Sequence, residues 1–370
     1  MKKRLIALTV AALASGAASA QVAPNNVTLY GIIDAGYNYF SDPNTKSDNS
    51  SVHAIDSSGQ STTRFGIKGT EDLGDGLAAK FDVQFTFPID TTGDAVTTYR
   101  KSNISLASAT LGEIKLGSFA TFEDDLISAT NVVAGNATVG SAGKVYLANG
   151  SYYNALGYFS PVWSGLQLRA AVTTAEKGGE VEPSYTTTQA TAKSNLRRFA
   201  IAAHYNNGPL IGGATYETNK YQNNNGLVDK FDSGDVWHLF GAYDFKVVRL
   251  NAAYGTYNYA ANTAEIKDTR KQWQLGASTP IGANGLLAVN YAQAKIHYRS
   301  AATSDDKQRF WGVAYFHNLS KRTNIYTAYG DISQNDSNQT ASKAYYGPSA
   351  TANSGHGYQQ AFTVGLRHQF

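Results

Sequence analysis

Lysines and arginines recur on the polar face of several segments in which apolar and polar residues alternate. Successive side chains of a β-strand point to opposite faces, so these bases share a face that the apolar residues avoid. Rings of charged side chains around a water-filled space are how pores select ions. The sequence therefore predicts a charged inner face with these bases: Arg64, Lys68, Lys80, Lys101, Lys115, Arg169, Arg198 and Arg249.

An acidic run, Glu123-Asp124-Asp125, occurs in residues 119–150, a long polar segment between two of the expected strands. This segment should fold inward, because a freely solvated loop rarely carries many apolar residues and burying them is favourable. The run would then face the basic wall, or else it is a solvated charge run or a helix start, since acids favour a helix N-terminus. The apolar residues in question are Leu126, Ile127, Val132, Val133 and Val139.

Residue spacing gives little support to other chemistries. The seven histidines show neither H-x-x-x-H nor H-E-x-x-H spacing, and G-x-x-x-x-G-K-[ST] is absent, so we expect no metal site and no cofactor. An enzyme would need a base next to a nucleophile, and no Ser–His spacing marks such a pair, so we expect no enzyme. Tyr and Trp near strand ends are interpreted as interfacial anchors in preference to sugar-stacking platforms.

The elements that would position the charged residues are antiparallel strands. Residues 27–40, 62–71 and 77–87 show the clearest alternation, and Asp34 and Asn38 fall on the polar face of the first. The composition, with 24 Tyr, 16 Phe and 35 Gly against 1 Met, is typical of strands and turns. After residue 20 no apolar run is long enough for a membrane-spanning helix, so a membrane protein of this composition must be a closed barrel.

Short and long connections alternate along the chain, as in outer-membrane barrels. Seven short turns and two chain ends on one side predict sixteen strands in a single domain, residues 21–370. The tight turns, most of them rich in Gly, Pro, Asn or Asp, are 72–76, 109–112, 161–165, 206–209, 244–246, 280–285 and 318–322. The long polar segments are 41–61, 88–98, 119–150, 175–196, 220–233, 259–270, 299–307 and 333–357.

Residues 1–20 have the three parts of a secretory signal peptide. A basic start at residues 2–4 precedes a short apolar core, and Ala18-Ser19-Ala20 is an A-x-A cleavage site. We expect cleavage between Ala20 and Gln21 and residence in the outer membrane. Removing the signal takes away three basic residues and leaves 28 bases and 28 acids, so net charge gives no support to nucleic-acid binding.

The final strand ends on an aromatic residue. Phe362, Val364, Leu366, His368 and Phe370 share one face of it, and an aromatic at the end of a barrel strand is favourable in the interfacial girdle.

Several segments resemble the general diffusion porins of Gram-negative bacteria, specifically the β-proteobacterial type. They are RFGIKGTEDLGDGL at 64–77, YFSPVWSGL at 158–166, LSKRT at 319–323 and VGLRHQF at 364–370. The resemblance implies an all-β transmembrane barrel of sixteen strands that assembles as a homotrimer, with a third external loop folded into the pore. It also implies a water-filled channel for passive diffusion of ions and small hydrophilic solutes, with size and charge selection at that loop.

The resemblance also implies partners. The last strand would be read by the barrel-assembly machinery, which makes Phe370 an assembly signal, and the barrel would lie among outer-membrane lipid and lipopolysaccharide. One position departs from the family: Leu116-Gly117-Ser118 stands where an arginine usually follows Leu-Gly and points at the constriction. The inward wall still has more bases than acids, so we expect a mild anion preference. A substrate-specific channel, a barrel enzyme and an adhesin remain as alternatives.

Overall fold

The computed structural model describes residues 26–41, 51–90, 98–133, 139–148, 150–174, 194–223, 231–260, 267–297, 305–334 and 359–370. The expected signal peptide and cleavage site, Ala20 and Gln21, lie outside these residues. The strands are β1 (Asn26–Ser41), β2 (Ser51–Ser57), β3 (Arg64–Gly74), β4 (Leu77–Thr86), β5 (Thr98–Ser108), β6 (Gly112–Ala120), β7 (Ser151–Phe159), β8 (Leu166–Thr173), β9 (Ser194–Asn207), β10 (Leu210–Asn223), β11 (Phe231–Asp244), β12 (Arg249–Ala260), β13 (Lys267–Ile281), β14 (Gly285–His297), β15 (Asp306–Asn318), β16 (Thr323–Gln334) and β17 (Gln360–Gln369). Between β6 and β7 lie a helix, α2 (Phe122–Thr130), and a short 3-10 turn, η1 (Ala142–Lys144).

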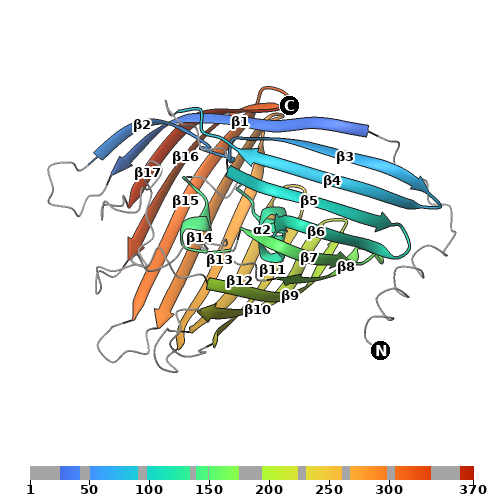
Figure 1. Cartoon of the computed structure of the whole chain (residues 1–370). Helices are drawn as coiled ribbons and strands as arrows, with labels where there is room; N and C mark the ends of the chain where they lie inside the picture. The colour runs from blue at the N-terminus through green and yellow to red at the C-terminus, as the bar shows by residue number, and fades with distance from the viewer. Residues whose placement is uncertain are drawn as a thin grey trace.

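The strands close into one antiparallel barrel. Successive strands pair from β3 to β17, and β17 pairs with β1 to close the ring. β2 and β3 are two stretches of one wall strand, because β2 pairs with residues 35–41 of β1 and β3 with residues 26–32. The wall therefore has sixteen strands, which confirms the predicted fold class (Figure 1).

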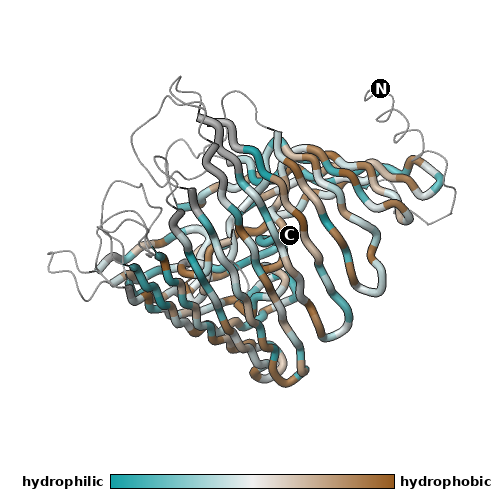
Figure 2. The backbone as a smooth tube through the Cα atoms, turned by 90° about the horizontal axis from the view of Figure 1, so that it is seen from below, coloured by the Kyte–Doolittle hydropathy of each residue, from teal (hydrophilic) through white to brown (hydrophobic). Residues whose placement is uncertain are grey.

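Side chains alternate across the wall as the sequence predicts. On β1, Ile33 and Tyr37 are 42% and 40% exposed on the outer surface, whereas the inward Asp34 and Asn38 are 0% and 4% exposed. Bands of contrasting hydropathy follow one another along the strands in Figure 2. An outer surface of exposed apolar residues around a polar inner face is the pattern of a barrel that stands in lipid.

All seven predicted tight turns join neighbouring strands at one end of the barrel, and the β3–β4 and β5–β6 turns are two of them (Figure 1). The prediction of an uninterrupted loop over 41–61 was wrong, because residues 51–57 form β2 and pair with β1. In the same way, β10 and β11 extend into the segment 220–233 that we predicted as a loop. Polar side chains do not prevent backbone pairing when a neighbouring strand supplies the hydrogen-bond partners, so polarity alone set the loop boundaries too wide.

The segment between β6 and β7, called loop three here, folds into the barrel. Its helix α2 lies against β9, β10, β11 and β12 inside the ring (Figure 1). Loop three packs with Phe240, Phe310 and Ile332 of the wall in one buried apolar cluster. All five apolar residues that predicted this fold belong to the cluster and are at most 7% exposed. No helix among the described residues is long and apolar enough to cross a membrane.

Candidate functional site: the pore constriction

Helix α2 brings the acidic run into the barrel. It begins after Thr121, whose hydroxyl accepts a hydrogen bond from the backbone N–H of Asp124 at 3.3 Å. Glu123, Asp124 and Asp125 occupy its first turn, where carboxylates complement the positive end of the helix dipole. The acidic run is therefore both a helix start and part of the inward loop, so the two alternatives drawn from the sequence do not exclude each other.

Hydrogen bonds to wall side chains hold loop three in place. A guanidinium N–H of Arg249 donates to the carbonyl of Ala129, at the end of α2, at 2.6 Å. The amide of Gln272 accepts from the N–H of Leu147 at 3.1 Å and donates to its carbonyl at 2.6 Å, as a neighbouring strand would. Further bonds run from Arg270 to the Val145 carbonyl, from Tyr257 to the Leu147 carbonyl and from Asn290 to the Gly140 carbonyl.

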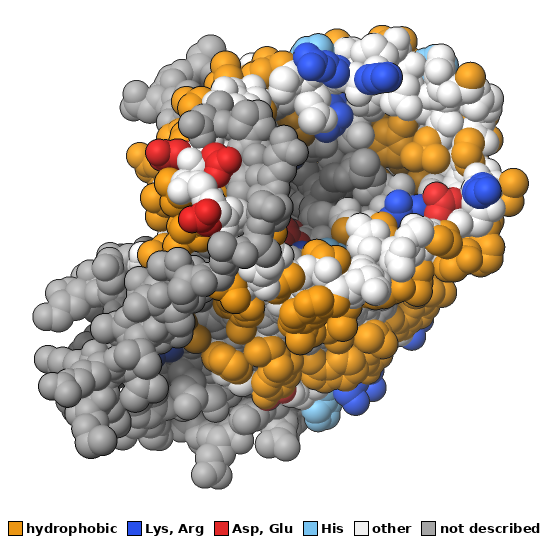
Figure 3. Space-filling model, turned by 90° about the vertical axis from the view of Figure 1, so that its right-hand side faces the viewer, with side chains coloured by type: hydrophobic (Ala, Val, Ile, Leu, Met, Phe, Trp, Pro, Cys, Tyr) orange, Lys and Arg blue, Asp and Glu red, His pale blue; other side chains and the backbone are white. Residues whose placement is uncertain are grey.

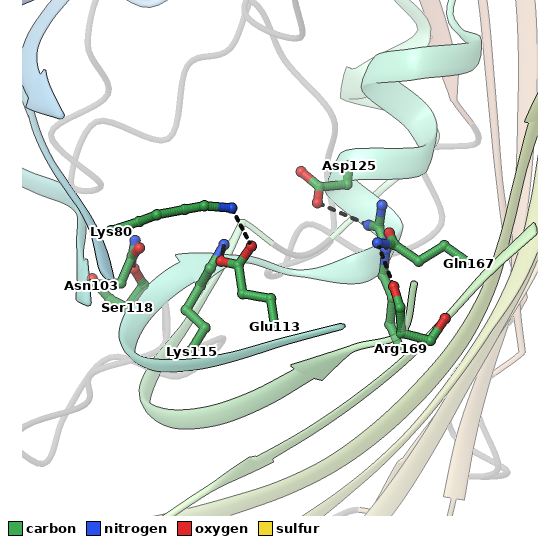
Figure 4. Close-up of polar contacts among 9 residues, drawn as sticks. Lys80, Asn103, Glu113, Lys115, Ser118, Asp125, Gln167 and Arg169 are labelled. Carbon is green, nitrogen blue, oxygen red and sulfur yellow. Dashed lines mark hydrogen bonds and ion pairs between the residues drawn. The ribbon is translucent and has the colours of Figure 1, made fainter. Parts of the chain in front are cut away.

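Asp125 on α2 forms an ion pair with Arg169 on β8 (Figure 4). Nη1 of Arg169 lies 3.1 Å from Oδ2 of Asp125. The same guanidinium donates from Nε to Oε1 of Gln167 at 2.9 Å and from Nη2 to Nδ1 of His204 at 2.6 Å. Three polar partners fix the orientation of Arg169, as a planar guanidinium fork allows.

Burial and nearby positive charges have opposite effects on the pKa of Asp125. Its side chain keeps 41% of its surface accessible, yet it is enclosed by the surrounding barrel, and this burial raises the pKa of its carboxyl. The charges of Arg169, Lys101 and Lys115 act in the opposite direction and partly offset the effect of burial on the pKa. Three of the predicted wall bases therefore act on one carboxylate of loop three.

A second charged cluster lies on β4 and β6 (Figure 4). The carboxylate of Glu113 lies 3.2 Å from Nζ of Lys80 and 3.4 Å from Nζ of Lys115. Lys115 also stands over the ring of Phe159, 4.7 Å from its centroid. Glu113 offsets part of the charge of the two lysines, and it was missing from the predicted site.

Three arginines form a cluster, and one of them, Arg64, interacts with Asp124 of the helix. The charge of Arg64 interacts with those of Arg100 and Arg367 and with the carboxylate of Asp124. Each of these arginines donates a hydrogen bond to residues 61–62, directly before β3. Bases from β3, β5 and β17 therefore gather at residues 61–62, and the charge of Arg64 reaches the first turn of α2.

Arg100 and Arg367 were missing from the predicted site, each for its own reason. The pairing of β4 with β5 shifts by one residue between Gln84 and Phe85. A count with period two fails across such a bulge, and Arg100 is the extra residue there. Arg367 could have been found, because it shares a face of the last strand with the buried Ala361 and Thr363.

Two predicted site residues are covered by protein. The side chain of Arg198 is 4% exposed, and its Nε lies 3.9 Å from Oε1 of Glu217, which is 1% exposed. Glu123 is 1% exposed. Neither side chain borders the open lumen in the described part of the barrel.

Two further positions lie on the wall, namely Lys68 on β3 and Ser118 on β6. Nζ of Lys68 stands over the ring of Tyr30, 5.1 Å from its centroid. Ser118, at the position of the usual family arginine, accepts the backbone N–H of Ser102 in its hydroxyl at 2.8 Å. Position 118 therefore contributes a hydrogen bond within the wall and no charge to the lumen.

The end of the barrel that carries the β3–β4 and β5–β6 turns shows a deep hollow, with Lys and Arg side chains at its border and hydrophobic side chains on the outer flank (Figure 3). A closed barrel with a hollow polar interior, narrowed by a charged inward loop, defines a membrane channel.

Comparison with known proteins specifies the class. Residues 7–337 match the family model described as Gram-negative porin. The chain is 32% identical to outer membrane porin protein 32 of Delftia acidovorans and 27% identical to an outer membrane porin protein of Bordetella pertussis, with full coverage of both partners in each case. Among solved structures, the anion-selective porin from Comamonas acidovorans matches with a TM-score of 0.72 at 26% identity, over 94% of this chain and 100% of that one.

The chain belongs to the Gram-negative porin family. It is an outer-membrane porin, a channel and not an enzyme. The family, the function and the location predicted from the sequence are thereby confirmed.

Proposed function

We propose that this porin prefers anions and that loop three sets both its size limit and its charge selection. The supporting observation is the excess of bases near α2. Arg64 interacts with Asp124 and also with the neighbouring Arg100 and Arg367, and the charges of Arg169, Lys101 and Lys115 act on Asp125. The match to a protein described as an anion-selective porin supports the same sign.

Opposed charges across the constriction create a transverse field. Carboxylates lie on the loop side and cationic groups on the wall side. The field between them orders the water there and sorts passing ions by their charge. Because the bases outnumber the acids, the net potential favours anions. Glu113 moderates this preference, since it offsets part of the charge of Lys80 and Lys115.

The decisive experiment is single-channel recording of the purified protein in a planar bilayer under a salt gradient. The zero-current potential should have the sign of anion preference. Replacing Lys68, Lys80 and Lys115 with Gln should move it towards cation preference, because three positive charges are lost and Glu113 keeps its negative charge. The matched control is Lys246→Gln, in the exposed turn before β12, which should leave the potential unchanged. A cation-preferring wild type would contradict the proposal.

The size limit has its own test. Removing residues 123–133 takes away most of α2 and should raise the single-channel conductance, because the lumen of a sixteen-stranded barrel is otherwise wide. An unchanged conductance in a variant that still assembles would mean that the narrowest point lies elsewhere.

We further propose that the protein functions as a homotrimer with a mature chain that begins at Gln21. The trimer rests on the family resemblance, and native mass measurement in mild detergent tests it. Small outward residues of β1 such as Gly31 and Ala35 would favour a contact between protomers, but the ring of Phe370 in the same chain occupies the space beside Gly31. N-terminal sequencing of the outer-membrane fraction tests the cleavage site, and a sequence that begins at Met1 would contradict it.

A further inference from the structure

Residues 58–63, called the inner bend here, interrupt the wall strand between β2 and β3. β2 pairs with residues 35–41 of β1, and β3 pairs with residues 26–32 of β1. The bend therefore stands opposite only two residues of β1. It begins with Ser58 in a left-handed conformation (φ 70°) and leaves the ladder towards the lumen.

The inner position of the bend follows from its contacts. Gln60 is 4% exposed and accepts a hydrogen bond from the side-chain amide of Asn324 at 2.7 Å. Asn324 and Tyr326 are buried, whereas Ile325 between them is 44% exposed on the outer surface. Because neighbours on a strand point to opposite faces, the residues that contact the bend lie on the lumenal face.

Asp34 of β1 holds the inner bend through its carboxylate. Oδ2 accepts the backbone N–H of Gln60 at 3.0 Å and that of Ser61 at 2.6 Å, and Oδ1 accepts the hydroxyl of Tyr326 at 2.7 Å. The backbone carbonyl of Asp34 accepts the N–H of Ser58 at 2.8 Å. Asp34 is 0% exposed, and a buried carboxylate needs such donors to offset its lost hydration.

The inner bend in turn provides acceptors for the arginines beside α2. Nε of Arg367 donates to the hydroxyl of Ser61 at 3.0 Å. Nη1 of Arg64 donates to the carbonyl of Thr62 at 3.1 Å, and Nη1 of Arg100 lies 3.5 Å from the hydroxyl of Thr62. The orientation of all three guanidinium groups therefore depends on where the bend is held.

We propose that Asp34 is a positioning residue for ion selection: it fixes the inner bend, and the bend directs Arg64, Arg100 and Arg367 at the constriction. This inference rests on the proposed charge selection at loop three. The positioning role predicts the direction in which anion preference changes when the Asp34 carboxylate is removed. A carboxylate that acted through its own charge would oppose anions, so its removal would raise anion preference. A carboxylate that acts through the bend supports the basic side, so its removal lowers anion preference.

The experiment measures the anion-to-cation permeability ratio from the zero-current potential in planar bilayers under a KCl gradient. Asp34→Ala removes both the charge and the acceptor, and should lower the ratio in the same direction as Arg100→Gln. Asp34→Asn removes the charge but keeps an oxygen for the N–H groups of the bend, and its amide can donate to Tyr326. It should retain the wild-type ratio or raise it.

A ratio that rises or stays the same in Asp34→Ala, while Arg100→Gln lowers it, would overturn the positioning role. A wild type that prefers cations would instead contradict the proposed function, and parallel shifts of Asp34→Ala and Arg100→Gln would still support the positioning role.

A variant that changes no charge tests the proposal if Asp34→Ala fails to assemble. A Cβ at Gly59 would lie 2.0 Å from the hydroxyl oxygen of Tyr326, which is 2% exposed and has little room to move. Gly59→Ala should therefore displace the bend and lower the permeability ratio without any change in charge. Its control is Gly241→Ala, because a Cβ there meets nothing within 4 Å. Equal ratios in these two variants would overturn the proposal.

Discussion

Gly31 and Phe370 exchange two backbone hydrogen bonds of 3.1 Å, and the ring of Phe370 covers the place where a side chain of residue 31 would be. A Cβ on Gly31 would lie 2.4 Å from Cζ of Phe370 and 2.7 Å from the backbone oxygen of Arg64. The first and last wall strands therefore meet at a position where only glycine fits.

Gly31→Ala should lower the amount of folded barrel. The methyl group meets a backbone oxygen that cannot move away, and overpacking of this kind costs about 1–3 kcal/mol. Gel electrophoresis of outer membranes measures this effect as a change in the folded, heat-modifiable fraction of the protein. Gly241→Ala is the control and should behave as wild type. Equal folded fractions in the two variants would mean that the junction tolerates a side chain.

Deletion of Phe370 should reduce assembly for two reasons. It removes both backbone hydrogen bonds to Gly31, and it removes the aromatic that we expect the barrel-assembly machinery to read. Unfolded chain should accumulate in the periplasm, which cell fractionation followed by immunoblotting detects. Phe370→Tyr keeps the backbone and the aromatic ring and should assemble normally. Unchanged yield on deletion would remove the assembly role.

Gln272→Met should loosen the part of loop three that leads back to β7. The variant keeps the length of the side chain but loses both hydrogen bonds to Leu147, which are worth roughly 1 kcal/mol each. Single-channel traces should show more open-state noise and more frequent partial closures. Gln293→Met, on β14, is the matched control. Quiet traces in both variants would show that the apolar packing of loop three is sufficient to hold it.

Alternation along the strands predicted which side chains of the wall face inward wherever the register between neighbouring strands is regular. Lys80 and Lys115 both pair across the sheet with Ser105, and all three stand on the inner face as period two requires. Their partner Glu113 lies two residues before Lys115, so it also shares that face, but nothing in the sequence says that its carboxylate would reach both lysines. That contact depends on how three strands are aligned.

Prediction failed where the register breaks. The bulge in the β4–β5 pair hid Arg100, and residues 58–61 of the inner bend were predicted as part of a long loop because their sequence is polar. The placement of Asp124 near Arg64 requires loop three to be folded inside the barrel. A pattern in one segment cannot specify such a contact, because the two residues are far apart in the chain.

Anion preference should increase as the pH falls, in a step that belongs to Asp125. Burial raises the pKa of this carboxyl above its ordinary value, against the opposing effect of Arg169. A raised pKa means that the protonated form becomes populated at a higher pH than for an exposed aspartate. Protonation removes one negative charge from the constriction. The positive charges of Arg169, Lys101 and Lys115 are then offset less, so the preference for anions increases.

The zero-current potential in a salt gradient, measured at decreasing pH, should show this step. Asp125→Asn carries no charge at position 125 at any pH, so it should have the higher anion preference above the step, match the wild type below it, and lack the step itself. Asp72→Asn, near the exposed end of β3, removes a carboxylate away from loop three, and this variant should show the same step as the wild type. If Asp125→Asn retained the step, the titrating group would have to be another carboxylate of the lumen, and Asp124 would be the next to replace.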